Sequence, residues 1–345
     1  MLLENRVYAL WVGKQTAKGA PNNNPSKRLI QVAGELGTAV DTGSENWSDL
    51  SKFGSVTQWV NSVLGNGTPG IEATPTELAY LLWLFHGAES VSAIAGPPAA
   101  SRHEFVPSLG GGHWATFATR MGQSIIRRHQ FNDCRIGQLV IEGSTGAKAV
   151  RVTPTVISLD PGEVRAADPA AAIPASVPFL YTDGAGAYEV DGDVFRGQSQ
   201  FTLTLNEGLT PVYGDDTRPH DVAQGDAGAT IAATLLLDSD ANALWNEKVY
   251  GSAAPAAGSK PLSRVAPIGG YGFRLEQTND SGAVNGRAFD FESDRIQWAI
   301  PDYPGPNPDG GSTEIAMAGT LRGNGTTPSY TIGVETGPAD VAFTV

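Results

Sequence analysis

Two aspartates, each in a turn-like sequence, are the residues best suited to catalysis. Asp41-Thr42-Gly43-Ser44 follows Ala39-Val40, and a second Asp-Ser-Gly occurs at Asp280-Ser281-Gly282. Two carboxylates held in contact share one proton, because both cannot ionise, and such a pair activates water. However, the polar residues Gln277-Thr278-Asn279 precede Asp280, where this chemistry needs a buried apolar strand. Asp-Thr-Gly and Asp-Ser-Gly are also ordinary turn sequences, so we expect turns at both places.

The remaining reactive side chains do not form a recognisable site. The five histidines lack paired ligand spacing; a hairpin could bring His103 and His113 together, but a third ligand is missing. The segment 238–242 begins like a calcium loop, yet Ala243 and Val249 stand where glycine and glutamate are required. Capping of a helix by Ser239 or Asp240 explains it more simply. The sequence therefore predicts no catalytic residue, no metal, no cofactor and no enzyme.

Composition excludes a transmembrane protein, a disulfide-stapled secreted domain and a cysteine-rich zinc protein. The chain has 345 residues, one cysteine and a net charge of −13. Cys134 alone cannot form an internal disulfide, and no apolar run reaches the roughly 18 residues of a membrane helix. The first residues lack the basic and apolar regions of a signal peptide, so none is expected.

The charge is unevenly distributed along the sequence. Residues 1–150 carry 12 basic and 11 acidic side chains, whereas residues 151–345 carry 11 basic and 25 acidic ones. An acidic surface repels phosphate, so tight binding of nucleic acid is not expected. An acidic wall along which DNA slides without adhering is compatible with the same charge.

Short segments rich in β-branched residues predict an all-β fold. Gln198–Asn206 is typical, because Phe201, Leu203 and Leu205 alternate with polar residues. The predicted strands are 103–107, 124–131, 135–142, 147–159, 198–206, 229–238, 287–299, 313–321 and 329–335. Two short helices are also predicted, at 74–87 and 239–250, each ending at a glycine. Neither is long enough to be stable alone, so each must pack on a sheet.

The elements divide into two halves. Prolines at 161, 169, 174 and 178 predict a linker over residues 161–178 between a first β domain, 1–160, and a second β half, 179–345. The second half is either a structural duplication of the first or part of the same sandwich. Residues 36–73 are polar and rich in glycine, asparagine and serine, which predicts a long functional loop. Its aromatic residues Trp47, Phe53 and Trp59 suggest a contact surface.

The order and spacing of the elements resemble the tail tube (major tail) proteins of long, non-contractile-tailed bacteriophages. The similarity covers nearly the whole chain, although each motif is loose. The segments that carry it are Trp11–Gly19, Leu84–Gly87, His103–Pro107, Phe131–Leu139, Gln200–Asn206 and Leu235–Asp238. The resemblance implies a β-sandwich or barrel flanked by a helix, whose subunits stack as rings around a lumen lined by a continuous β-barrel. The second helix departs from the single flanking helix of many tube proteins.

The resemblance also implies a role. The protein would be a structural component of the virion tail, made in the bacterial host cytoplasm, with no membrane partner. Its rings of six chains, or three if the halves are duplicated folds, would enclose the tape-measure protein, meet tail terminator and distal tail proteins, and conduct DNA during ejection. We expect Trp47, Phe53 and Trp59 to contact the next ring. The acidic residues Glu142, Asp160, Glu207 and Asp238, at strand ends, are candidates for the lumen wall.

Two alternatives remain open at this point. A monomeric β-sandwich could bind a carbohydrate or receptor on an aromatic platform of Trp47, Trp59 and Trp114. A pepsin-like aspartic protease would use Asp41 and Asp280, but no Tyr-Gly flap follows Asp41 at a suitable distance. Assembly into rings would separate the tube protein from both alternatives.

Overall fold

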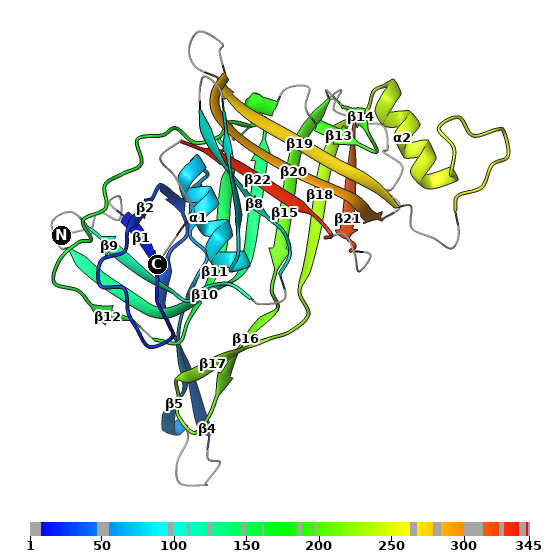
Figure 1. Cartoon of the computed structure of the whole chain (residues 1–345). Coiled ribbons are helices and arrows are strands. Elements are labelled where there is room, and N and C mark those ends of the chain that lie inside the picture. Colours follow the sequence, from blue (N-terminus) through cyan, green and yellow to red (C-terminus); the bar gives the residue numbers. More distant parts are fainter. Residues whose placement is uncertain are drawn as a thin grey trace.

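Strands make up most of the computed structural model, and two short helices accompany them (Figure 1). The structure describes residues 8–46, 55–95, 99–108, 111–122, 126–146, 149–160, 162–184, 188–195, 197–262, 268–278, 284–299, 313–323, 328–337 and 343. The prediction of an all-β sandwich with two short helices is confirmed. In the described residues, no helix is both long and apolar enough to cross a membrane.

Twelve strands and one helix lie in the described residues of the first half of the chain. They are β1 (Tyr8–Lys14), β2 (Lys27–Leu29), β3 (Gln31–Ala33), β4 (Leu36–Asn46), β5 (Ser55–Gly67), β6 (Gly70–Glu72), α1 (Pro75–His86), β7 (Ser90–Ile94), β8 (Ala100–Phe105), β9 (Ala115–Met121), β10 (Arg127–Ser144), β11 (Arg151–Ser158) and β12 (Glu163–Val164). β12 lies within the segment predicted as a linker. It pairs with β10, so the start of that segment is attached to the first half.

The second half begins with a 3-10 turn, η1 (Tyr181–Gly184), and contains one helix. Its elements are β13 (Tyr188–Val190), β14 (Asp193–Val194), β15 (Gln198–Asn206), β16 (Leu209–Tyr213), β17 (Pro219–Gln224), β18 (Gly228–Leu236), α2 (Ser239–Tyr250), β19 (Ile268–Thr278), β20 (Val284–Trp298), β21 (Glu314–Leu321) and β22 (Thr331–Thr336).

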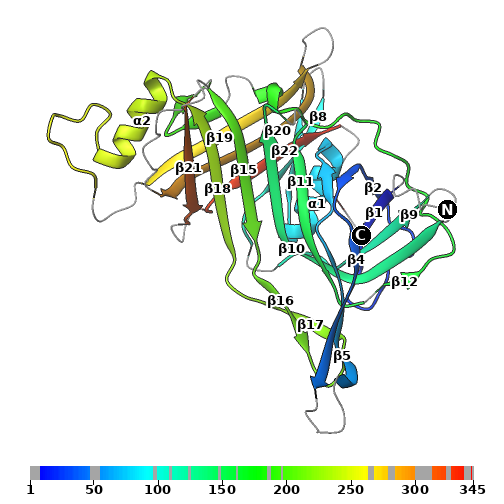
Figure 2. The same cartoon turned by 180° about the vertical axis from the view of Figure 1, so that it is seen from behind.

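One long antiparallel sheet runs through both halves. Its strands follow the order β3, β6, β11, β10, β15, β18, β21 and the end of β20. Figure 2 shows β11, β10, β15 and β18 side by side, with the hairpins β4–β5 and β16–β17 extending beyond their lower ends. The two halves therefore share a backbone ladder at β10–β15, and a second ladder joins β8 to β22.

A second layer covers one face of this sheet. In the first half β2, β1 and β9 pair in turn up to the start of β10, and in the second half β14, β13 and β19 pair in turn up to β20. β22 then pairs with β20, and β8 and β7 complete the layer. The long strands β10 and β20 belong to both layers, because bulges let each change partners along its length. Between the layers lies one continuous apolar core.

The same succession of pairings occurs in the two halves. In the first half β1 pairs with β9, β3 with β6, β4 with β5, β6 with β11, β9 with β10, β10 with β11, and β10 with β12. In the second half the corresponding pairs are β13–β19, β15–β18, β16–β17, β18–β21, β19–β20, β20–β21 and β20–β22. The helices α1 and α2 occupy the same place in this order.

The helices have the ends that their sequences predict, with one change of cap. Gly87 and Gly251 both adopt left-handed backbone conformations and close the last turn. The N-cap of α2 is Asp238, whose carboxylate accepts the backbone N–H groups of Asp240 and Ala241 at 3.1 and 2.8 Å. The prediction that Ser239 or Asp240 is the cap was therefore wrong by one or two residues.

The prediction of a long loop over residues 36–73 was also wrong. Most of the segment is the hairpin β4–β5, in which Leu36 pairs with Gly67 and Asn46 with Ser55. The hairpin projects from the body of the molecule (Figure 1). Because it projects into solvent, neither face needs an apolar stripe, and the alternation that marks a half-buried strand is missing from its sequence.

Candidate functional site: the open sheet face and the projecting hairpins

Within the residues that the structure describes, one face of the long sheet is left uncovered. Inward side chains such as Ile141, Leu203, Ile231 and Met317 are at most 2% exposed, because they pack against the second layer. Their neighbours in sequence point the other way. These outward residues include Gln138, Val140, Glu142 and Ser144 on β10, Thr202 and Thr204 on β15, Thr230, Ala232 and Thr234 on β18, and Ala316, Ala318 and Thr320 on β21. The open face is thus built mainly of short, uncharged side chains.

Charged residues at one end of this face partly compensate one another. Arg151 on β11 stands between Glu142 on β10 and Glu72 on β6 in the strand register. Its guanidinium lies 3.6 Å from the Glu142 carboxylate, and both side chains are more than 40% exposed. Of the four acidic residues predicted to face a lumen, Glu142 is the one on the open face.

The other three acidic residues have local partners elsewhere. Asp160 follows β11 and accepts hydrogen bonds from the Asn132 side chain and the Gly162 backbone at 3.0 and 3.1 Å. Asp238 caps α2. Glu207 is buried and lies 3.2 Å from Arg135. Burial raises the pKa of Glu207, and the nearby Arg135 opposes that rise.

Two hairpins extend in the same direction from the edge of the long sheet. β4–β5 and β16–β17 lie against each other, and the Val63 backbone N–H donates to the Thr217 carbonyl at 2.9 Å. Their exposed apolar side chains are Val40, Val60 and Tyr213. Exposed apolar side chains on projecting hairpins indicate a contact surface.

The three aromatic residues predicted to make that contact can be placed only in part. Trp59 belongs to β5, where it pairs in register with Gly43. Trp47 and Phe53 lie outside the described residues. Trp114, the third member of the alternative sugar-binding platform, is covered by cations: Lys18 and Arg135 lie 5.7 and 5.3 Å from its ring. A covered indole does not favour a sugar-binding platform.

Asp41 of the possible protease pair is exposed and lies on a strand, so the prediction of a turn there was wrong. Asp41 lies on the exposed hairpin strand β4 and accepts a hydrogen bond from Asn61 at 3.1 Å. Asp280 lies outside the described residues. An acid protease needs a desolvated carboxylate pair, and the exposure of Asp41 does not provide half of one.

Two of the five histidines, His86 and His103, are buried in the interior of the fold. His103 is fully buried, with Nδ1 2.8 Å from Glu89 and Nε2 3.1 Å from the Thr336 hydroxyl. All three groups are buried, so no substrate reaches them. His113 packs on the Trp83 ring at 4.6 Å instead of meeting His103. Within the part of the chain that the structure describes, no three His, Cys, Asp or Glu side chains could hold a metal together.

A second surface, missed by the sequence analysis, lies at the far end of the second layer. Ile126, Arg127, Arg128, His129, Val164 and Arg165 line a hollow where β12 pairs with the start of β10. Val164 is 83% exposed, the highest value among the described large apolar side chains. A sequence signal was present: Arg127-x3-Phe131-x3-Arg135-Ile136 recurs as Arg287-x3-Phe291-x3-Arg295-Ile296. The recurrence marks β10 and β20 as equivalent strands.

Comparison with known proteins gives one result. A family model described as phage tail tube protein matches residues 25–259, about two thirds of the chain. No curated protein matches the sequence. The matched range includes the hairpins, α1, the junction β10–β15 and α2.

Proposed function

Because the chain belongs to the phage tail tube protein family, and is therefore a structural component of the virion tail, we propose that it assembles into stacked rings. The rings would form the tube of a long, non-contractile tail. The tube would enclose the tape-measure protein, end at tail terminator and distal tail proteins, and later conduct DNA to the host. No step of this function requires catalysis.

The long sheet is the observation that supports this proposal most directly. It runs from β3 to the end of β20, and one of its faces is covered by the second layer. Copies joined edge to edge would bend such sheets into a closed barrel, which removes the exposed edges. The covered face would lie outside, and the open face would line the lumen.

The composition of the open face suits the passage of DNA. Its threonine, alanine, serine and glutamine side chains offer no array of cations for phosphate to bind. Glu142 is the predicted lumen residue that we retain there, because it is the one of the four at an outward position of the long sheet. DNA would pass along a nearly neutral wall, rather than the strongly acidic wall that the net charge suggested.

The projecting hairpins support stacking between rings. They extend past the ends of the sheet strands, along the direction in which the next ring would lie (Figures 1 and 2). Trp59 on β5 and the exposed Val40 and Val60 would provide apolar contact area, together with Trp47 and Phe53. Head-to-tail contacts of this kind generate open filaments.

The proposal is tested by electron microscopy of the purified chain at high concentration. We expect rings or hollow tubes with a central channel. A protein that stays monomeric under all conditions, and is absent from the tails of virions, would contradict the proposal.

The lumen assignment needs its own experiment. Thr204→Arg together with Thr230→Arg would place cations on the open face, and phage tails built with this variant should release DNA at least tenfold more slowly. Fluorescence of released DNA measures the rate. Glu189→Arg, on the exposed side of the second layer, is the matched control. Equal release by both variants would show that the open face does not meet DNA.

A further inference from the structure

The two halves share packing as well as pairing order. In the first half Phe117 on β9 stands opposite Phe131 on β10, and in the second Phe273 on β19 stands opposite Phe291 on β20. Both phenylalanines of β10 and β20 belong to the recurring Arg-x3-Phe-x3-Arg-Ile motif. Val164 pairs with His129, and Val334 pairs with Phe289. These two partners lie 160 positions apart, the same separation as Phe131 and Phe291, so Val164 on β12 corresponds to Val334 on β22. Each half is therefore one copy of the same unit.

The chain contains one complete junction between such units. β10 pairs with β15 from Gln138–Asn206 to Ser144–Gln200, which joins the two copies of the long sheet. Above this ladder, α1 of the first unit packs against β20 and β22 of the second, and His86 contacts the Tyr330 ring. Residues Glu77 to His86 of α1 are all buried between strands of both units. Val334 on β22, which pairs with His103 on β8, is 0% exposed.

The two ends of the molecule farthest from this junction carry complementary parts of a second one. In the described part of the chain β3 pairs with β6 alone, whereas its counterpart β15 has partners on both sides. Val164 is 83% exposed, although its counterpart Val334 is fully covered. α2 buries only Ala241, Leu244, Trp245, Lys248 and Val249, far less than its counterpart α1. Each missing contact is one that the first junction supplies.

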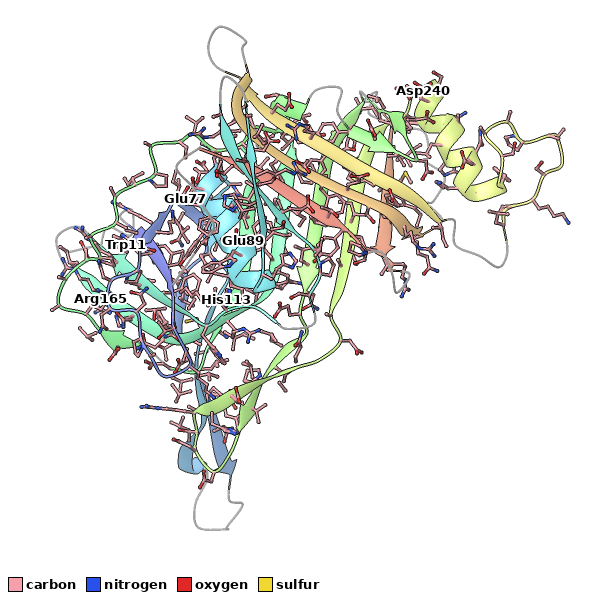
Figure 3. All side chains as sticks on the ribbon, in the orientation of Figure 1. Trp11, Glu77, Glu89, His113, Arg165 and Asp240 are labelled. Atoms are coloured by element: carbon pink, nitrogen blue, oxygen red, sulfur yellow. The ribbon has the colours of Figure 1, made fainter. Side chains whose placement is uncertain are left out.

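The charges at the two ends are complementary. The hollow beside Val164 is lined by Arg127, Arg128 and Arg165, and Arg127 has no ion-pair partner among the described residues. α2 exposes Asp240 and Glu247. Figure 3 shows Asp240 and Arg165 at opposite ends of the molecule, so one chain cannot bring them together. A second copy can, and opposite charges would favour that orientation.

We propose that copies of this chain join head to tail through a contact that repeats their internal junction. α2 of one copy would cover Val164 and the arginines of the next, as α1 packs on β22. The outer edge of the long sheet, beside β21, would continue onto the free edge of β3. The inference rests on the proposed assembly into rings. It also favours a ring of three chains over six, since each chain contributes two units.

Charge reversal tests the contact. Asp240→Arg with Glu247→Arg should raise the concentration needed for ring assembly at least tenfold, and so should Arg127→Glu. Combining all three substitutions should restore at least part of the assembly, which a merely structural defect would not allow. Glu189→Arg is the control and should assemble normally. Val164→Asp should also block assembly without lowering the melting temperature of the monomer, because the side chain is 83% exposed.

Hydrogen exchange of the unaltered protein supplies a second measurement. On assembly, the amides of Gln31–Ala33 and of β12 should exchange at least a hundredfold more slowly than in the monomer. Tubes in which both segments keep their monomer rates, or in which the charge-reversed variants assemble normally, would overturn this interface and leave the proposed function standing. A chain that never assembles would overturn both.

Discussion

At the scale of single residues, His86 is the side chain whose chemistry the fold alters most clearly. It lies in the last turn of α1, stacked on Phe105 at 6.0 Å, and burial lowers its pKa to about 4. Its Nε2 has no hydrogen-bond partner in the described structure. The folded protein therefore holds this imidazole neutral over a pH range in which the unfolded chain protonates it.

This difference predicts a stability that depends on pH. Above about pH 6.5 the imidazole is neutral in both states; as the pH falls towards 4 only the unfolded chain binds the proton, so the free energy of unfolding decreases. We expect a loss on the order of 3 kcal/mol between pH 7 and pH 4.5, measured by urea denaturation, and a smaller loss in His86→Phe. His113, whose pKa is also lowered to about 4, leaves part of the slope. Identical slopes in the two proteins would contradict the prediction.

The sequence made it easier to exclude catalytic residues than to predict where functional residues lie. The absence of a recognisable catalytic motif was apparent from spacing alone, and the exposure of Asp41 agrees with it. The lumen candidates were less predictable, because net charge does not say which carboxylates have partners. Glu207 pairs with Arg135, which lies 72 positions away, and no local pattern reveals a contact across that separation.

At the scale of elements, the hairpin β4–β5 should control stacking without affecting the ring. Val40→Asp with Val60→Asp places charge on exposed apolar positions of the hairpin. We expect single rings in place of tubes, counted by negative-stain microscopy, with the melting temperature unchanged. Val194→Asp, at a similarly exposed site on β14, is the control. Full-length tubes from the double variant would show that the apolar side chains of the hairpin are not required for stacking.

The helix α2 depends on one ion pair with the turn after β13. The Lys248 ammonium is 2% exposed and bonds to Asp191, which also accepts the Gly270 backbone N–H at 2.6 Å. Asp191→Ala leaves the buried cation only the longer, 3.7 Å contact with the exposed Glu247, and should lower the free energy of unfolding by about 3 kcal/mol. The exposed neighbour Asp193→Ala should change it by less than about 0.5 kcal/mol. Chemical denaturation measures both changes, and equal effects would show that α2 does not depend on the Lys248–Asp191 ion pair.

Helices and buried strands could be predicted from the sequence because their signals are local. Thr74-Pro75 and Gly87 bound α1, and the alternation of Phe201, Leu203 and Leu205 marks β15. The hairpin β4–β5 has no such signal, since both its faces meet solvent. The matching pairings of the two halves were hidden for a related reason: only a few core positions, such as Phe131 and Phe291, recur in the sequence.

At the scale of the whole molecule, an ionic network fastens the two halves in the second layer. Arg102 on β8 binds Asp290 on β20 through two hydrogen bonds of 2.6 and 2.8 Å, and Arg274 joins Asp290 to Glu335. Paired geometry of this kind is stronger than a single ion pair.

Removing the central guanidinium should therefore destabilise the chain. We expect Arg102→Met to lower the free energy of unfolding by about 2 kcal/mol, because Asp290 loses a partly buried partner. Arg151→Met breaks the exposed pair with Glu142 and should cost less than about 1 kcal/mol. Denaturant titration distinguishes the two variants, and a larger loss for Arg151→Met would refute the assignment.

The short side chains of the open sheet face have a consequence for the bore of the proposed tube. Alanine ends at Cβ, and serine and threonine extend only one bond past it, so rotamer changes barely alter how far the wall extends. The clearance around a passing double helix would then be fixed by the curvature of the backbone ladders, and it would stay nearly constant along the tail while the side chains fluctuate.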